Sequence, residues 1–287
     1  MGYHSVPQFY LNGFAKKDTR LLYVYEKGKN IPQLLPIKNV AQEKGLYSNE
    51  IETFLAENIE RPANKVLRKI RNQESISEED KGILGQYIFV FFKRVPLAKR
   101  RFQEAAPRIA NELKNRFSQS FDNLKQKHPE KSVLYEKGRR ETERILKDLA
   151  EDPSEEIWQN TIPIKSKKAT DYLSRMTWTF LTCEGPDIFL TNDNPVFIFK
   201  RLGINKRSSE LTFPISSNVM LFATWWNIQD LSYIKADSQY IKEMNRRIAF
   251  IADRYIYSNI KREWIITLAN KKNHILHLIA NSKPNLF

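Results

Sequence analysis

The chain has 287 residues, with 47 Lys and Arg against 33 Asp and Glu and a formal net charge of +14. Hydrophobic residues make up 41% of it, and 17 Phe, 12 Tyr and 5 Trp supply the bulk of a core, which excludes a globally disordered chain. This length allows one large domain or two modest ones, and we expect a single domain over residues 1–287.

Cys183 is the only cysteine, so no disulfide can form within the chain, as is typical of a reducing compartment. The apolar run around it, WTFLTC, favours a buried, inert thiol over a catalytic one. No apolar stretch approaches the ~20 residues that span a bilayer, and the N-terminus lacks a basic start followed by an apolar block. We therefore expect a cytoplasmic protein without a membrane partner.

Short strands and turns are predicted for residues 1–46. The segment 21–27 is rich in β-forming residues and is followed by Gly28, a turn signal. Prolines interrupt residues 31–37, which predicts an edge strand or a loop.

Helices are predicted next. Residues 48–70 place apolar side chains at three- and four-residue spacings, and Pro62 should end or kink this helix. Ser77 and Asp80 resemble a capping pair ahead of the apolar run 83–92, which predicts a buried helix.

The segment 93–116 carries eight Lys and Arg against two Glu. This excess predicts a surface that faces a polyanion, although a solvated helix face is the alternative. Polar helical sequence continues to about residue 150, so residues 98–150 are expected to form a helical hairpin or insertion within the domain. The proposed anion-binding residues are Arg94, Lys99, Arg100 and Arg101.

The remainder mixes helices and strands. A helix is predicted at 166–183, another at 238–258, and a helix or strand at 262–270. Four strands are predicted at 187–191, 196–200, 210–215 and 219–224. The expected fold class is α+β, with a helix-rich scaffold, a helical central insertion and a small, mainly antiparallel sheet that also includes the N-terminal strands.

Three motifs occur together in this chain: HSVPQFYL (4–11) followed by Phe14, TNDNPV (191–196), and a pair of glutamates followed by FKRVP (92–96). Together they resemble the domain-of-unknown-function 4238 family, over nearly the whole chain. Residues 213–216 and 245–247 are similar to weaker family positions, and Phe91 stands where the family often has glutamine. Because the family is uncharacterised, the resemblance implies site residues and no reaction.

His4 is a candidate base or metal ligand, because imidazole serves both roles near neutral pH. The structural alternative is a histidine hydrogen-bonded beneath a strand. Gln8 would share a face with His4 if this segment were helical. Near the C-terminus, His274 and His277 are interpreted as surface or packing residues.

Asp193 and Asn194 lie between two predicted strands. A rigid strand end is a suitable place for a catalytic acid. The sequence Asn-Asp-Asn-Pro is equally good turn chemistry, in which side chains bond nearby amides.

Glu52 and Glu60 are eight residues apart, which in a helix is about 12 Å along the axis. That separation prevents the two carboxylates from sharing one small ion directly. Each could pair with an arginine such as Arg94. Alternatively, one of them could join His4 and Asp193 around Mg²⁺, Mn²⁺ or Zn²⁺.

Two hypotheses follow. In the first, the protein is a metal-dependent nuclease or another nucleic-acid-processing enzyme. Its ligands for Mg²⁺ or Mn²⁺ would be His4, Asp193 and Glu52. Its catalytic residues would be His4, Gln8, Asp193, Asn194, Glu52 and Glu60. In the second, it is a non-catalytic nucleic-acid- or protein-binding module in which His4, Gln8 and Asp193 are structural pins. The enzyme is slightly favoured, and it requires these side chains to converge.

Overall fold

The computed structural model describes residues 2–164, 167–199, 202–226 and 230–279. By its internal contacts the chain divides into two compact units, one of residues 1–95 with 163–287 and the other of residues 96–162. In the part of the chain described, none of the helices combines the length and the apolar character needed to cross a membrane.

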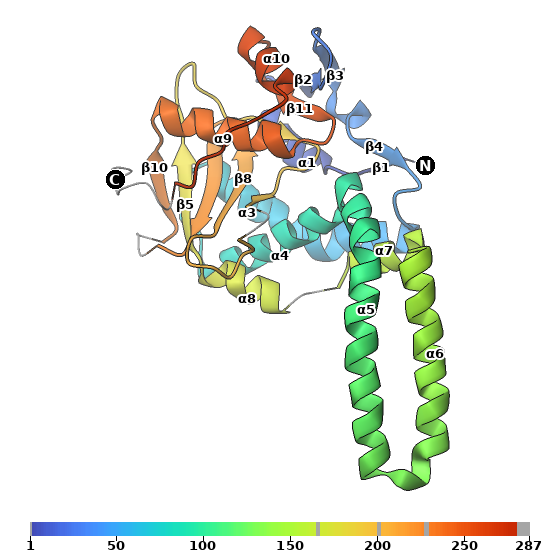
Figure 1. Ribbon diagram of the computed structural model, residues 1–287. Helices are drawn as coiled ribbons and strands as arrows, with labels where there is room; N and C mark the ends of the chain where they lie inside the picture. The colour runs from blue at the N-terminus through green and yellow to red at the C-terminus, as the bar shows by residue number, and fades with distance from the viewer. Residues whose placement is uncertain (1, 165–166, 200–201, 227–229, 280–287) are drawn as a thin grey trace. The chain divides into compact units, whose positions relative to one another are not determined.

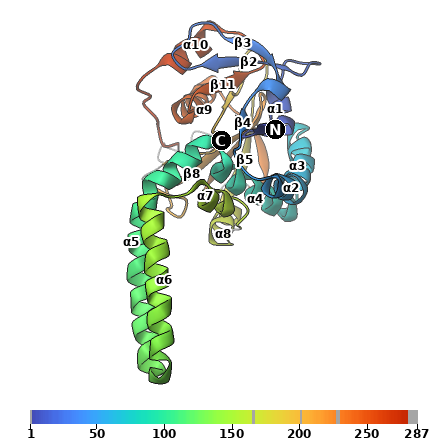
Figure 2. The ribbon, with the colours of Figure 1, turned by 90° about the vertical axis from the view of Figure 1, so that its right-hand side faces the viewer.

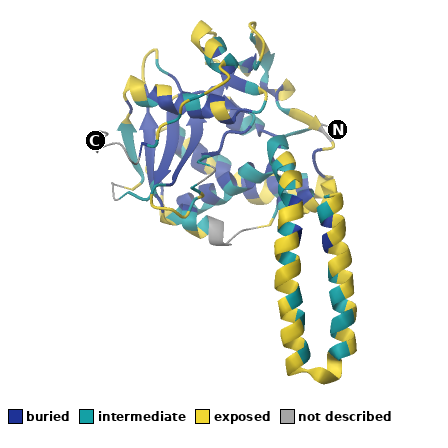
Figure 3. Ribbon diagram, viewed as in Figure 1, coloured by how far each residue is buried: buried dark blue, intermediate teal, exposed yellow. Residues whose placement is uncertain are grey.

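The first unit contains a five-stranded sheet in the order β10-β5-β9-β8-β7. Neighbouring strands are antiparallel, except that β10 runs parallel to β5. The strands are β5 (Thr177–Thr182), β7 (Phe197–Ile198), β8 (Glu210–Ser216), β9 (Val219–Thr224) and β10 (Ser232–Lys235). Every residue of β8 and β9 is buried, because helices cover both faces of this sheet (Figures 1 and 3).

One face of the sheet packs against α9 (Ser238–Ile251), and the other against the helices near the N-terminus (Figure 2). Along β9, Met220 and Phe222 point to the α9 side, where they join Met244 and Ile248 in one apolar cluster. On the opposite face Phe213 contacts the rings of Tyr10, Tyr87 and Phe91. The period-two alternation of strand side chains therefore assigns each strand residue to one of two cores.

Helices that pack on or beside this sheet are α1 (Gln8–Leu11), α2 (Asn49–Leu55), the π-helical turn η3 (Ala56–Glu60), α3 (Arg61–Arg71), α4 (Glu78–Arg94) and α8 (Lys167–Arg175). Ser77 begins α4 with a capping box, in which its side chain and that of Asp80 bond each other's backbone amides. The 3₁₀ turns η1 (Asn12–Phe14) and η2 (Ile37–Asn39) complete the N-terminal part.

A separate four-stranded antiparallel sheet has the order β3-β2-β11-β6. Its strands are β2 (Leu21–Glu26), β3 (Gln33–Pro36), β6 (Thr191–Asn192) and β11 (Tyr255–Ser258), and α10 (Glu263–Asn270) packs beside β2. A two-stranded ladder joins β1 (Gly2–His4) to β4 (Gln42–Lys44).

The second unit is helical. It consists of α5 (Pro96–Lys127), the 3₁₀ turn η4 (Pro129–Lys131), α6 (Ser132–Glu151) and α7 (Glu155–Thr161). The helices α5 and α6 lie side by side along their length (Figures 1 and 2). Their small apolar interior is formed by Ala106, Ala110, Leu146 and Leu149, and most other residues of the pair are exposed (Figure 3).

The predicted α+β class is confirmed, and three element predictions are wrong. The helix predicted at 166–183 ends at Arg175, and residues 177–182 form the central strand β5. Residues 187–190 are not a strand, and the helix predicted at 238–258 gives way to β11 after Ile251. A strand buried on both faces has no polar alternation, so its apolar run cannot be distinguished from a buried helix by periodicity. In addition, the N-terminal strands do not extend the central sheet, because β2 and β3 join β11 and β6 in a separate sheet and β1 pairs with β4.

Candidate functional site

Three of the residues singled out in the sequence, His4, Glu52 and Glu60, meet at Arg94, the last residue of α4. Its guanidinium is buried, with 2% of the side chain exposed, and Nη1 forms an ion pair with Glu60. Nη2 donates to the backbone carbonyl of His4 at 2.8 Å and to the Tyr47 hydroxyl at 2.5 Å. Glu52 Oε2 lies 3.9 Å from the same nitrogen. The predicted pairing of these glutamates with Arg94 is confirmed.

The π-helical turn explains how both glutamates reach one arginine. A straight α-helix would separate residues 52 and 60 by about 12 Å along its axis. Residues 56–60 instead form a π-turn between α2 and α3, which changes the direction in which Glu60 projects. The two carboxylates thus pair with one arginine and do not share an ion directly.

The charges of this centre depend on one another. Burial would lower the pKa of Arg94, but the Glu60 carboxylate and the Tyr47 hydroxyl beside it raise that pKa above its ordinary value. Burial raises the pKa of Tyr47 to about 12. It also raises the pKa of Glu52, whose carboxyl stays partly exposed and whose Oε2 has no hydrogen-bond partner among the described residues. Glu52 is thus the more exposed carboxylate of this centre, with 32% of its side chain exposed against 17% for Glu60.

The imidazole of His4 lies apart from this ion pair. Only the backbone carbonyl of His4 contacts Arg94 and Tyr47, whereas ring Nε2 donates to the carbonyl of Lys38 at 3.1 Å. His4 is in β1, so it shares no helix face with Gln8, which accepts a hydrogen bond from Arg20 at 3.2 Å. The His4 ring therefore binds the Lys38 backbone, and the His4 carbonyl binds the side chains of Arg94 and Tyr47, which fits the structural alternative of a hydrogen-bonded histidine.

Asp193 and Asn194 bind the backbone that follows α9. The Asp193 carboxylate accepts the amides of Asp253, Arg254 and Tyr255 at 2.8, 2.7 and 2.9 Å. Asn194 Nδ2 donates to the carbonyl of Ile251 at 2.9 Å. Burial raises the pKa of Asp193 to about 6, against the opposing effect of the three amide donors.

Asn192 completes this turn. Its Nδ2 donates to the carbonyl of Ile248 at 2.5 Å, and its Oδ1 accepts the amide of Asn194 at 2.8 Å. The segment 192–194 thus satisfies backbone groups that the end of α9 leaves open. Nearby, Thr191 Oγ1 and Tyr10 Oη lie 2.7 Å apart, which fastens α1 to the same strand. The turn interpretation of Asn-Asp-Asn-Pro agrees with this geometry.

The motifs of the N-terminus, the Arg94 helix and the 191–196 turn thus occupy defined positions in one fold. A model of the family described as "Protein of unknown function (DUF4238)" matches residues 3–262. The chain belongs to the DUF4238 family. No curated protein and no solved structure matches it.

Metal ligation of the kind proposed from the sequence requires three or more suitable side chains in one place. Within the described part of this DUF4238 chain, no group of three or more His, Cys, Asp and Glu is arranged to hold a metal ion. Glu52 is at the Arg94 centre, Asp193 is at the end of α9, and the His4 ring is turned to Lys38. The structure does not bring these three together.

The proposed anion-binding surface is wrong at Arg94, whose side chain is buried and ion-paired. In the second unit Lys99 pairs with Glu155 at 2.6 Å and lies over the ring of Trp158. Arg100 is exposed and Arg101 is half-buried. Residues 96–162 carry 14 Lys and Arg against 12 Asp and Glu, so most of the net charge lies elsewhere in the chain.

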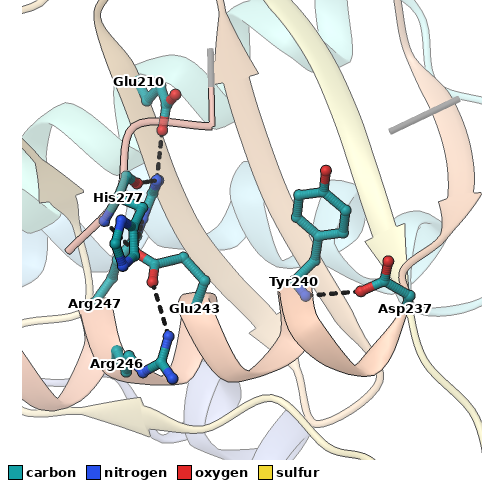
Figure 4. A network of polar contacts seen from close by, with 7 residues as sticks. All are labelled: Glu210, Asp237, Tyr240, Glu243, Arg246, Arg247 and His277. Carbon is teal, nitrogen blue, oxygen red and sulfur yellow. Dashed lines mark hydrogen bonds and ion pairs between the residues drawn. The ribbon is translucent and has the colours of Figure 1, made fainter. Parts of the chain in front are cut away.

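A third polar centre, at Arg247 of α9, was noticed in the sequence only as a weak family position (Figure 4). Arg247 and Glu210 of β8 are completely buried, and Arg247 Nη2 donates to Glu210 Oε2 at 2.5 Å. Glu243, one helical turn before Arg247, approaches Nε at 3.4 Å. The guanidinium carbon lies 5.1–6.0 Å from the ring centres of Phe197, Phe199 and Phe222.

Sequence reasoning missed Glu210 and Glu243, although both leave a signal. Glu243 and Arg247 have the i, i+4 spacing of a helical ion pair. Glu210 is an acid at the start of a run of β-forming residues, where burial requires a partner of opposite charge. Cys183, by contrast, is buried as predicted, and burial raises the pKa of its thiol to about 12.

Proposed function

We propose that this DUF4238 protein is a non-catalytic nucleic-acid-binding protein that contacts the phosphate backbone through α3. The carrying observation is the charge of this helix, which has five Lys and Arg and no acidic residue. Two of the five are used internally, since Arg71 donates to the carbonyls of Phe9, Tyr10 and Ile215, and Lys69 pairs with Asp80. The other three are exposed.

The exposed residues Arg61, Lys65 and Arg68 lie at four- and three-residue spacings, so they form one stripe. The opposite face buries Ala63, Val66, Leu67 and Ile70 in the core, which fixes the direction of the stripe. From the first to the third residue the helix rises about 10 Å, a span of about three phosphates on one strand of a duplex. A basic stripe along a helix is the electrostatic footprint expected for contact with a nucleic-acid backbone.

The geometry of the candidate catalytic residues supports a binding role over an enzyme. A metal-dependent nuclease needs clustered ligands, whereas here Asp193 and the His4 backbone bind other parts of the fold. In this proposal these residues hold segments of the fold together, as in the second hypothesis from the sequence. The nuclease stays a prediction.

The test is binding of a fluorescent 20-base-pair DNA duplex and a 20-nucleotide RNA, followed by anisotropy at 100 mM NaCl. Replacing Arg61, Lys65 and Arg68 by alanine should weaken binding on the order of 10- to 100-fold, because backbone contacts supply most of non-specific affinity. The matched control replaces Lys114, Arg116 and Lys137 of the second unit, which removes the same charge and should change Kd less than about threefold. Equal weakening in the two variants, or no binding by the unaltered protein, would reject the proposal.

A further inference from the structure

The segment 271–279 crosses the Arg247 centre as an extended strap. It follows α10 and contains no helix or strand. Ile279 is buried in the apolar cluster beneath α9, whereas Ile275 is 73% exposed. Between them, His277 contacts the ionic centre with its backbone and leaves its side chain exposed (Figure 4).

The backbone of His277 makes two complementary hydrogen bonds. Its amide donates to Glu243 Oε1 at 2.9 Å, and its carbonyl accepts from Arg247 Nη2 at 2.7 Å. Glu243 and Arg247 are one helical turn apart, so an acceptor and a donor stand side by side on α9 at the spacing of one peptide residue's C=O and N–H. On the strap, these contacts use only the backbone of His277, so any residue with an amide hydrogen could make them.

The Arg247 centre is held by more contacts than the strap that covers it. Arg247 is held by Glu210, Glu243 and three aromatic rings, and its Nη1 has no hydrogen-bond partner within the described residues. The centre also lies inside the region that the family model matches, which ends at residue 262, before the strap begins. The docking centre therefore lies within the residues that the family model matches, and its cover lies outside them.

We propose that Glu243 and Arg247 form a docking site for an extended peptide segment, which the strap occupies in cis. The ligand is a peptide with a free backbone amide at the latch position and an apolar residue two positions later, as His277 and Ile279 supply here. A partner segment of this kind gains access when the strap is released. This inference is independent of nucleic-acid binding by α3.

The experiment compares two full-length variants. The open variant combines His277→Pro, which removes the amide donor, with Ile279→Ser, which removes the apolar anchor. The matched closed variant combines His277→Ala with Ile275→Ser, which changes the same residue types but leaves both anchors in place. The probe is a fluorescent peptide with the sequence of residues 271–279, KKNHILHLI.

We expect the open variant to bind the probe at least about tenfold more tightly than the closed variant or the unaltered protein, because a tethered strap competes at an effective concentration of the order of millimolar. A probe with proline at its seventh position should not bind. Equal binding to the two folded variants, or no binding to the folded open variant, would overturn the proposal.

A measurement on the unaltered protein decides the matter if the open variant does not fold. In hydrogen exchange, the His277 amide should exchange more slowly than those of residues 274–276, yet at least about 100-fold faster than the amides at the centre of α9, because the strap opens locally. Exchange of His277 only together with α9 would show that the strap does not release, and the proposal would fail.

Discussion

Arg94 joins several segments of the N-terminal part of the fold. Its buried charge is balanced by Glu60 and Glu52, and its donors hold the His4 carbonyl and the Tyr47 hydroxyl. Removing one partner of a buried pair leaves the other charge without compensation, which is costlier than losing both. Removing Arg94 should therefore lower the free energy of unfolding by more than breaking a surface ion pair does.

Arg94→Met, which keeps the length of the side chain, should lower the free energy of unfolding by about 3–5 kcal/mol. The control Lys99→Met breaks the more exposed pair with Glu155 and should cost no more than about 1 kcal/mol. Urea denaturation followed by circular dichroism measures both. Similar decreases for the two variants would contradict the buried role of Arg94.

Asp193 should make stability depend on pH. Its folded pKa of about 6 is raised above the ordinary 3.8 by burial, so the folded protein binds the proton more tightly than the unfolded chain. The stabilisation from this group is complete below about pH 4 and is lost as pH rises through 6. Each unit of pKa difference corresponds to about 1.4 kcal/mol, which partial exposure reduces.

Asp193→Asn should therefore lose this contribution to the pH profile. The free energy of unfolding, measured in urea between pH 4.5 and 7.5, should fall by about 1–2 kcal/mol more in the unaltered protein than in the variant. Asp187, which is half-buried and carries no amide network of this kind, gives the matched control Asp187→Asn. If both aspartate variants keep the full pH dependence, the account of Asp193 is wrong.

Individual residues could be predicted from the sequence where local chemistry decides them. The Glu–Arg94 pairing and the turn at Asn192 to Asn194 required only charge, amide chemistry and helical spacing. The π-turn that connects α2 to α3 between Glu52 and Glu60 was not predicted from the sequence. The Arg247 centre depends on a strand and a strap that are more than 60 residues apart in sequence.

At the scale of elements, helix-capping residues predicted structure better than the periodicity of apolar residues did. The capping pair Ser77 and Asp80 correctly begins α4, whereas the apolar segments 177–182 and 255–258 were assigned to helices and form strands. Their partners across the sheet supply the hydrogen bonds that override local preference. Position in the sheet is a long-range property, so a short apolar run does not reveal it.

Ser77→Ala should lower the stability of the first unit by about 1 kcal/mol, since it removes the acceptor for the amide of Asp80. Ser75 is exposed two residues earlier, and Ser75→Ala should change stability by less than about 0.5 kcal/mol. Thermal unfolding compares the two. A larger decrease at Ser75 would show that the capping box does not fix the start of α4.

At the scale of the whole molecule, net charge indicates a basic surface only after the Lys and Arg that form internal ion pairs are discounted. The segment 93–116 has the greatest local excess in sequence, but its arginine and lysine side chains include a buried pair at Arg94, a pair with Glu155 and a pair within α5 between Arg108 and Glu112. The helix α3 has a smaller total and keeps three exposed cations on one face. The fold class followed from composition and pattern, whereas the location of the basic surface required the partners of each charge.

The salt dependence of DNA binding tests the central claim most directly. If α3 contacts the phosphate backbone, log Kd should change linearly with log salt between 50 and 200 mM NaCl. The slope should fall by about 2–3 when Arg61, Lys65 and Arg68 become alanine, because each phosphate that the protein no longer neutralises lowers it by about 0.9. The slope should stay unchanged when Lys114, Arg116 and Lys137 are replaced. The same slope in the unaltered protein and the α3 variant would contradict the assignment of α3 as the nucleic-acid-binding surface.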